Sequence, residues 1–178
     1  VGSEMCIRDR YNIAEQLGVT AYNVFVWSPN SVSMPGTEAN AMKNYYPGDM
    51  YVDWLGVSCY PPSLSATYPE ERRYPLTLMQ GIKQVSADKP IMISEGGYSS
   101  TCDHQRWVRE WFKLKDEEPR VKAVVWENHE NAENGDRRLQ SDPLALELYK
   151  ELVQDPYWLD LIPDAVYSEI ETRKNNSK

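Results

Sequence analysis

Glu95 is the residue in this sequence whose type and position best suit chemistry. It ends an apolar run, residues 90–95, and is followed by Gly96 and Gly97. A carboxylate at the end of an apolar run costs free energy unless it is paired, hydrogen-bonded or functional, and glycines let a backbone or a ligand approach closely. The pattern therefore indicates a catalytic carboxylate, and the alternative is a solvated acid just beyond a strand.

Aromatic residues end the three other apolar runs of the sequence, at Trp27, Tyr60 and Trp126. Aromatic rings pack against the apolar faces of sugars, and an acidic cleft lined with tyrosine and tryptophan suits neutral polyols. Core packing is the alternative for each ring taken alone. Because three aromatics and one glutamate end four successive runs, we interpret the set as a sugar-binding cleft that contains a carboxylate.

Glu127 follows the last of these runs and begins an acidic loop, residues 127–136. Adjacent strands lie about 4.8 Å apart, and the two carboxyl groups of retaining glycosidases lie about 5–5.5 Å apart. Glu127 is therefore a candidate second carboxylate beside Glu95. The interpretation that we favour for Glu127 is a solvated loop charge.

The histidines and cysteines form no metal motif. His104 and His129 lack metal-ligand spacing and are expected on the surface. Cys59 and Cys102 fall near the same end of neighbouring units, where a disulfide is geometrically possible, although free thiols are the favoured interpretation. We expect no metal and no cofactor.

Four short apolar runs predict the strands that carry these residues: 23–27, 54–60, 90–95 and 121–126. Each is nearly continuously apolar, which is typical of strands buried on both faces of a parallel α/β sheet. The ends of the runs are 33, 35 and 31 residues apart. Eight such units would total about 260 residues, close to the roughly 250 of a (β/α)₈ barrel, so the chain is predicted to be half of one. An open doubly wound sheet would usually have a glycine-rich loop after its first strand. Residues 27–30, at the end of the first predicted strand, contain no glycine.

Helical patterns lie between the predicted strands. Residues 76–85 carry apolar side chains at three-residue spacing. Asp103 and Asp142 are predicted helix N-caps, the second of them before a proline at the first helical position. Residues 11–17 predict the end of an earlier helix that a glycine stops. Residues 31–50 predict a long loop with at most a short helix.

The composition excludes several classes of protein. The chain has 178 residues, with 19 Lys+Arg, 27 Asp+Glu, a net charge of −8 and 41% hydrophobic residues. That hydrophobic content is too high for a disordered chain, and no run approaches the roughly 18 apolar residues of a membrane span. The acidic balance opposes binding to nucleic acid.

The chain divides into three predicted parts. Residues 1–10 resemble a leader produced by translating adapter sequence in assembled environmental reads, and they lack the apolar core of about 7–15 residues found in a signal peptide. The alternative is a natural amphipathic helix start. Residues 11–154 form the predicted partial barrel domain. Residues 155–178 are a tail, with an aromatic patch before a short polar helix or a frayed end.

Several stretches, in order along the chain, resemble glycoside hydrolase family 26, best known for endo-β-1,4-mannanases. Residues 26–30 resemble the fifth strand of the family, residues 45–57 the approach to the sixth strand and the strand itself, and residues 89–95 the seventh. Parts of residues 121–143 resemble the eighth strand, its loop and the last helix. The resemblance covers about residues 11–152.

The resemblance implies the C-terminal half of a (β/α)₈ barrel that hydrolyses a β-linked glycan with retention of configuration. Glu95 matches the nucleophile, which forms a covalent glycosyl-enzyme intermediate, and Tyr60 matches a tyrosine that orients this nucleophile. Trp126 matches a sugar platform. Trp27 and Glu127 complete the expected substrate-binding set.

Three departures from the family pattern bear on this expectation. The general acid/base of the family lies at the end of the fourth strand, in a His-Glu motif with nearby tryptophans, and the first four strands would lie upstream of residue 1. Glu127 stands where an aromatic residue or an arginine is common. Arg137 replaces an expected tryptophan.

The predicted function is retaining cleavage of β-1,4-mannan or a related β-glycan, with the isolated chain inactive because it holds only the nucleophile half. The expected partners are the polysaccharide and the missing N-terminal half of the barrel, with neither nucleic acid nor a membrane span. The alternatives are a non-catalytic carbohydrate-binding relic, another retaining β-glycanase (a xylanase or a mixed-linkage glucanase), and a complete small α/β protein with another function. Similarity to polymer-degrading enzymes implies a secreted or periplasmic protein.

Overall fold

The computed structural model of the chain describes residues 3–61, 74–100, 102–131 and 135–159. The α-helices are α1 Ser3–Gln16, α2 Pro75–Leu78, α3 Gln80–Lys83, α4 His104–Glu117 and α5 Pro143–Leu152. The strands are β1 Val26–Trp27, β2 Trp54–Cys59, β3 Ile91–Gly96, β4 Val121–Trp126, β5 Glu130–Asn131 and β6 Gly135–Asp136. Short 3-10 helices are η1 Thr20–Tyr22, η2 Glu38–Asn40, η3 Met42–Tyr45, η4 Asp49–Tyr51 and η6 Leu139–Ser141.

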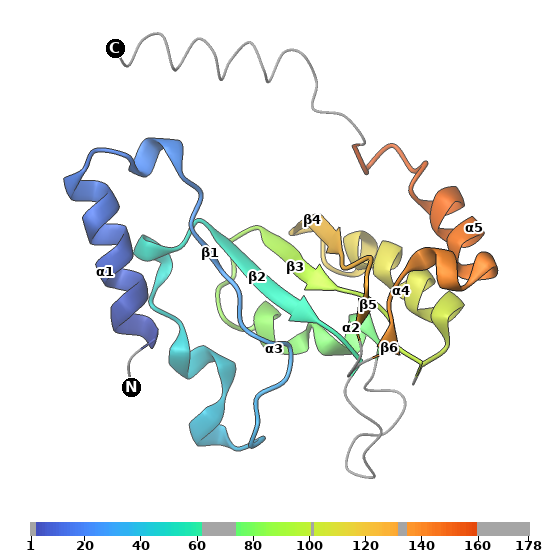
Figure 1. Cartoon of the computed structure of the whole chain (residues 1–178). Coiled ribbons are helices and arrows are strands. Elements are labelled where there is room, and N and C mark those ends of the chain that lie inside the picture. The colour runs from blue at the N-terminus through green and yellow to red at the C-terminus, as the bar shows by residue number, and fades with distance from the viewer. Residues whose placement is uncertain (1–2, 62–73, 101, 132–134, 160–178) are drawn as a thin grey trace, which may run out of the picture.

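The main sheet is parallel, and its strands follow the order β1-β2-β3-β4 (Figure 1). Strands in chain order with crossovers between them confirm the predicted α/β class with four parallel strands. β1 is shorter than predicted, because only Val26 and Trp27 pair with β2. Before it, the Asp53 carboxylate accepts a hydrogen bond from the Phe25 N–H at 2.8 Å, so a side chain replaces the ladder partner there.

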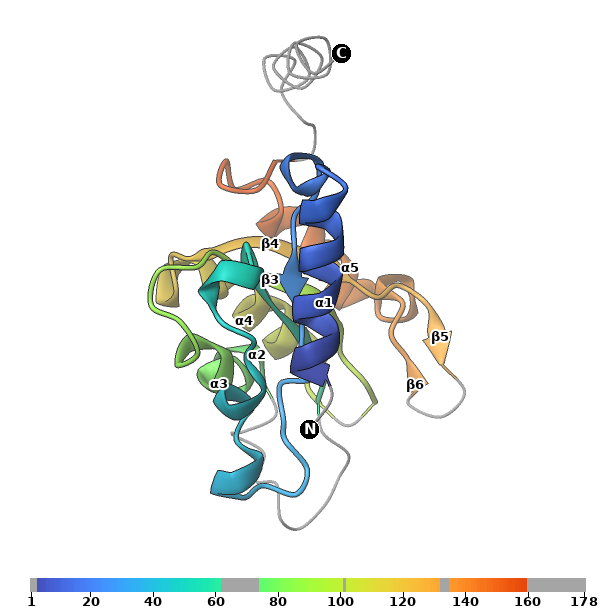
Figure 2. The same ribbon diagram turned by 90° about the vertical axis from the view of Figure 1, so that its left-hand side faces the viewer.

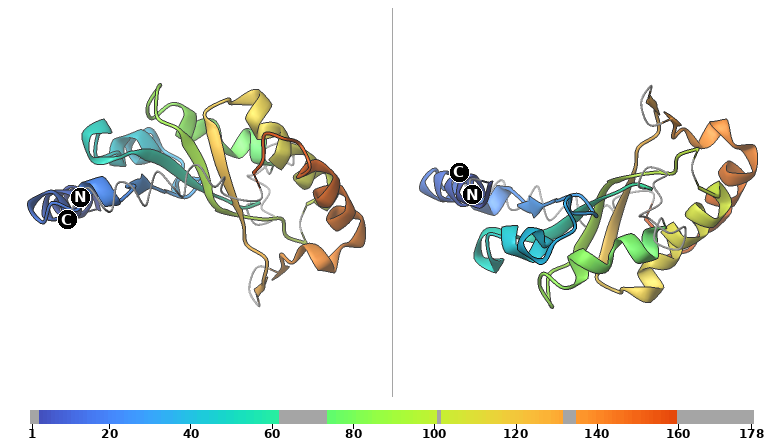
Figure 3. Two further views of the ribbon diagram at one scale, coloured as in Figure 1. Left: turned by 90° about the horizontal axis from the view of Figure 1, so that it is seen from above. Right: turned by 90° about the horizontal axis from the view of Figure 1, so that it is seen from below.

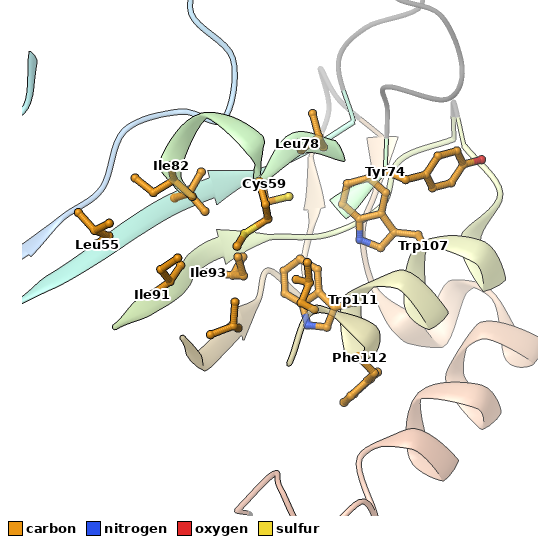
Figure 4. Packing of buried hydrophobic residues seen from close by; sticks show 14 of the residues in the cluster. Leu55, Cys59, Tyr74, Leu78, Ile82, Ile91, Ile93, Trp107, Trp111 and Phe112 are labelled. Atoms are coloured by element: carbon orange, nitrogen blue, oxygen red, sulfur yellow. The ribbon is translucent and has the colours of Figure 1, made fainter. Parts of the chain in front are cut away.

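The core lies on the helix-covered face of this sheet. Figure 4 shows Leu55 and Cys59 of β2 and Ile91 and Ile93 of β3 in one cluster with Ile82 of α3 and, at its other end, Trp107 and Trp111 of α4. All four of these strand residues are fully buried. On the other face Ser58, Met92 and Ser94 stay partly exposed, since side chains alternate between faces along a strand. The prediction of burial on both faces is therefore met on one face only within the described residues.

α4 and α5 begin where the sequence predicts. The Asp103 carboxylate accepts from Arg106 N at 2.9 Å and caps α4. Asp142 accepts from the N–H groups of Leu144 and Ala145 and caps α5, whose first residue is a proline. The two helices pack together on one side of the sheet, with α1 at the far end beside β1 (Figure 3). The helix predicted over residues 76–85 is instead two short helices, α2 and α3, that meet at Met79.

α1 ends before Gly18, whose φ of 67° suits the left-handed turn that stops a helix. The helix runs through the predicted boundary at residue 10, and Arg8 Nε donates to Pro47 O at 3.1 Å. The origin of residues 1–10 stays a prediction.

Residues 31–50 form the expected loop with short 3-10 helices. Figure 2 shows α1 in front of the sheet and the β5–β6 hairpin projecting from the body.

His104, expected on the surface, is partly exposed and is bonded through both ring nitrogens. Its Nδ1 lies 2.9 Å from Asp142 Oδ2, its Nε2 lies 3.1 Å from Ser99 O, and its ring stacks on Tyr98 at 3.9 Å. The histidine therefore joins the N-termini of α4 and α5 to the segment after β3. All three cysteines are free thiols, which answers the open question of a disulfide between Cys59 and Cys102.

No helix among the described residues has the length and apolar character needed to cross a membrane.

Candidate active site

The structure joins Glu95 and Tyr60 directly. Glu95 lies near the end of β3 with an exposed side chain, and Tyr60 follows the last residue of β2. The Tyr60 hydroxyl donates to Glu95 Oε1 at 2.5 Å. Since β2 and β3 are neighbours and run parallel, their C-terminal ends meet at one edge of the sheet, which is where (β/α)₈ barrels carry their chemistry.

Gly96 makes the end of β3 fit its surroundings. A Cβ atom at this position would lie 2.5 Å from Cys59 O and 2.6 Å from the Trp111 ring. Only glycine lets the strand pass this close to β2 and to α4, so Gly96 positions the neighbouring Glu95. Gly97 is less constrained, because its nearest neighbour would be Glu127 O at 3.6 Å.

Glu127 is not the solvated loop charge that the sequence favours. Its side chain is 19% exposed and accepts from Arg137 Nη1 at 2.6 Å, and His129 Nδ1 lies 3.1 Å from its other oxygen. Its backbone N–H donates to Gly96 O at 2.8 Å, which continues the pairing of β3 and β4 beyond Trp126. Glu127 therefore stands beside the β3 end as an ion-paired carboxylate.

Tyr60 hydrogen-bonds Glu95, and the Arg137 guanidinium that pairs with Glu127 lies over the Tyr60 ring. Burial raises the pKa of its phenol first, and hydrogen bonding to Glu127 and then to Glu95 raises it further. Both effects disfavour the phenolate. Tyr60 therefore stays protonated and acts as a hydrogen-bond donor at ordinary pH.

Trp126 packs among aromatic rings. Its ring meets Tyr98, Trp111 and Tyr149 edge to face at centroid distances of 5.1, 5.3 and 5.7 Å. Its indole N–H donates to Arg137 O at 3.0 Å, and its side chain is half-buried. These contacts hold the ring rigidly at the end of β4, and its role as a sugar platform stays a prediction.

Trp27 is buried, with 6% of its surface exposed, and meets the Tyr46 ring at 5.1 Å. It lines a cavity of about 510 Å³ beside β1, together with Met42 and residues of the following loop. Trp27 thus packs in the core, and its place in a substrate cleft stays a prediction.

Two serines connect β1 to the candidate site, which sequence reasoning missed. The hydroxyls of Ser28 and Ser94 hydrogen-bond to each other across β2. Gly56 of β2 lies between them, and a Cβ atom there would come within 2.8 Å of Ser28 Cβ. The glycine in the middle of an apolar run was the available signal, since such a glycine often marks a close approach.

The sequence contains one His-Glu dipeptide, His129-Glu130, of the kind that carries the general acid/base in the family. In this chain it follows β4, the last strand of the parallel sheet. The Glu130 side chain is 66% exposed and pairs with Arg138 at 3.2 Å. Among the described residues, no group of three or more histidines, cysteines, aspartates or glutamates is arranged to hold a metal ion.

Comparison with solved structures assigns this arrangement to a class of fold. The chain is similar to a GH26 β-mannanase from Bacteroides ovatus, with a TM-score of 0.57 and 18% identity, over 88% of this chain and 44% of that one. It is similar to a GH26 endo-β-1,4-mannanase domain from Bacillus sp. JAMB-750, with a TM-score of 0.57 and 19% identity, over 88% and 44%. A modular GH26 endo-β-1,4-mannanase from Cellulomonas fimi matches with a TM-score of 0.58 and 18% identity, over 88% and 36%.

The sequence comparisons are weaker. No family model matches the chain. A protein named endoglucanase H, from Acetivibrio thermocellus, is 29% identical over 113 residues, which are 61% of this chain and 12% of that protein. The chain thus spans a small part of this relative and less than half of each solved structure.

The chain therefore has the α/β fold of part of a (β/α)₈ barrel, and the part matches the barrels of family 26 glycoside hydrolases. The resemblance read from the sequence is confirmed at the level of the fold.

Proposed function

We propose that this chain is the nucleophile-bearing part of a retaining β-glycanase of glycoside hydrolase family 26. The observation that carries the proposal is the exposed Glu95 carboxylate at the end of β3, held by a protonated Tyr60 hydroxyl at 2.5 Å. In a retaining reaction one carboxylate attacks the anomeric carbon and a second carboxyl group protonates the leaving oxygen. Glu95 would be the attacking group and Tyr60 would hold it in line.

The substrate that we propose first is β-1,4-mannan, because the structurally similar proteins named above are β-mannanases. A β-glucan is the second candidate, since the sequence relative is named an endoglucanase. Trp126, Trp27 and Glu127 are the proposed substrate contacts. Secretion or periplasmic export is proposed with the polymeric substrate.

The general acid would come from the rest of the barrel, because family 26 carries it on the fourth strand. We therefore expect the 178-residue chain to show no turnover of mannan. The attack by Glu95 is testable without that acid, since a glycosyl fluoride has a leaving group that needs no proton. A Glu95 oxygen bonds to the anomeric carbon, the C–F bond breaks with its electron pair, and fluoride leaves.

The experiment is to incubate the chain with a 2-deoxy-2-fluoro-β-mannotriosyl fluoride and to follow its intact mass. The fluorine at C2 slows hydrolysis of the covalent product. The expected result is one added glycosyl group, mapped by peptide sequencing to Glu95 and absent in Glu95→Gln. Labelling at another residue, or equal labelling of the variant, would overturn the proposal. Faster labelling by the cellotriosyl analogue would favour the glucan.

A non-catalytic carbohydrate-binding protein is the second candidate function. The observation in its favour is that Tyr60 contacts Glu95, and that the half-buried Trp126 ends the strand next to β3, whether or not an acid is present. Calorimetric titration with mannopentaose separates the two proposals. Binding without any labelling of Glu95 would replace the glycanase proposal by this one.

A further inference from the structure

Arg137 is a buried arginine that touches three members of the candidate site. Only 6% of its surface is exposed. Its Nη1 donates to Glu127 at 2.6 Å, its guanidinium carbon lies 4.1 Å from the centre of the Tyr60 ring, and its backbone carbonyl accepts from the Trp126 indole. One residue of the β6 loop thus reaches three predicted site residues on two strands.

The contacts of Arg137 are incomplete as a structural ion pair. Its Nε is buried and has no hydrogen-bond partner among the described residues. An arginine buried only for stability is normally bonded on all its donors, because a buried donor without a partner destabilises the fold. The guanidinium instead lies over the face of Tyr60, where a cation is attracted by the ring.

Tyr60 has one hydroxyl proton and two carboxylates that approach it. The distance to Glu95 Oε1 is 2.5 Å, and Arg137 brings Glu127 close to the same tyrosine, since its guanidinium pairs with Glu127 at 2.6 Å and lies 4.1 Å from the centre of the Tyr60 ring. Burial raises the pKa of the phenol most, and Glu127 and Glu95 raise it further. A phenol can donate only one such bond at a time. Whichever carboxylate is already neutralised by another donor competes less strongly for this proton. Arg137 neutralises Glu127, and no arginine or lysine is recorded on Glu95 within the described residues.

We propose that Arg137 is a positioning residue that directs the Tyr60 hydroxyl to Glu95 by pairing with the competing carboxylate of Glu127. The inference rests on the proposed function, in which the oriented Glu95 attacks the sugar. It also goes beyond the family resemblance, in which a tryptophan is expected at position 137.

The first test is the rate at which the mannotriosyl fluoride labels Glu95. Arg137→Met removes the charge and keeps an unbranched apolar stem, and we expect labelling to slow by at least about tenfold because the nucleophile is no longer oriented. Arg137→Lys should recover part of the rate. Arg137→Met combined with Glu127→Gln should recover most of it, since the competing carboxylate is gone.

The matched control is Arg138→Met, which removes a neighbouring arginine whose side chain is 46% exposed and paired with Asp136. Its labelling rate should equal that of the wild type. A merely structural role for Arg137 predicts that the double variant is no faster than Arg137→Met. That result, with both variants folded by circular dichroism, would overturn the inference.

The second test does not depend on any reaction with sugar. Crystal structures of the wild type and of Arg137→Met would give the two distances from the Tyr60 hydroxyl to Glu95 and Glu127. We expect the hydroxyl to bond Glu95 in the wild type and to turn to Glu127 in the variant. An unchanged Tyr60–Glu95 bond would overturn the inference even where no labelling is seen.

A wild type that stays unlabelled contradicts the proposed function, and the crystal structures still decide the role of Arg137. If Arg137→Met does not fold, Arg137→Lys and the double variant, which leaves no unpaired charge, enter the same two measurements.

Discussion

Two arginine–glutamate pairs stand at opposite ends of the same sheet. Arg120 precedes β4 and pairs with Glu118 at the N-terminal ends of the strands. Arg137 follows β6 and pairs with Glu127 at the C-terminal ends. Both pairs are largely buried, so burial alone does not separate a structural pair from one that serves a site.

The difference lies in how many of the donors are used. Arg120 bonds both Glu118 oxygens at 2.9 Å and the carbonyls of Ser86 and Lys83 at 2.6 and 3.3 Å. The Arg120 side chain also holds the pKa of Glu118 below its usual range, against the opposing effect of burial. The side chain of Arg120 thus donates only to other groups of the protein. Such a pair has a structural role, because it connects the end of α3 to the loop before β4.

Within the described part of the chain, Arg137 makes one ion pair and its Nε has no hydrogen-bond partner. Its guanidinium also lies over the ring of a tyrosine that holds an exposed carboxylate. In (β/α)₈ barrels the N-terminal face serves stability and the C-terminal face carries chemistry. The two arginines differ in their bonding in the way that such a division would produce.

The largest expected effect is at the stability end. Arg120→Met leaves the Glu118 carboxylate buried with only Lys83 beside it, at 3.9 Å, and we expect the free energy of unfolding to fall by about 3 kcal/mol. Urea titration followed by circular dichroism measures this loss. The rate of Glu95 labelling by the folded variant should be unchanged. A labelling rate reduced as much as in Arg137→Met would break the distinction between the two ends.

A smaller loss is expected at Gly96. Gly96→Ala places a methyl group against Cys59 O and the Trp111 ring, and such overpacking costs about 2 kcal/mol. Thermal unfolding measures the loss, and labelling should slow as well because the β3 end must shift. Gly97→Ala is the matched control, since its methyl group meets only ordinary contacts. Equal melting temperatures for the two variants would contradict this explanation.

The smallest effect is expected at the cap of α5, on the same side of the sheet as Arg137. Asp142→Ala removes the N-cap and should cost about 1 kcal/mol at pH 7. The pKa of Asp142 is lowered, first by its hydrogen bond from Ala145 N, against desolvation, and then by His104. The carboxylate therefore stabilises the fold above its unfolded pKa of about 3.9, and this stability is lost as the pH falls through the lowered value.

Thermal unfolding of Asp142→Ala and the wild type between pH 7 and pH 2 checks the pH dependence. The difference in stability should be constant down to about pH 4 and then shrink. A difference that grows on acidification would show that the cap does not act through its charge.

Much of the scaffold was predictable from local patterns. Three of the four apolar runs predicted β2, β3 and β4 to within a residue or two, and the fourth run contains the shorter β1. Asp103 and Asp142 predicted the starts of α4 and α5. These features depend on short-range chemistry: β-branched runs, side chains that cap nearby N–H groups, and glycine or proline at helix ends. The family resemblance added the expectation that Tyr60 and Glu95 meet, and the structure places them 2.5 Å apart.

The errors fall where a distant partner decides. Glu127 lies in an acidic loop and reads as solvated, yet Arg137, ten residues later, pairs with it across a hairpin. His104 is predicted at the surface, yet its ring contacts Asp142, the N-cap of another helix. The sequence around a charged residue in a polar stretch does not show whether that residue will have a partner. The partner comes near only when a loop folds.

The sequence by itself determined the parallel α/β class, the placing of strands and helix caps, and the presence of a glutamate and aromatics at successive strand ends. Only the tertiary structure decided which of these side chains touch. Register between β2 and β3 brings Tyr60 to Glu95, and the return of the chain after β6 brings Arg137 under both Tyr60 and Glu127. The physical reason is that element formation depends on neighbours along the chain. Pairing of charges depends on burial and on loop closure, which no local pattern contains.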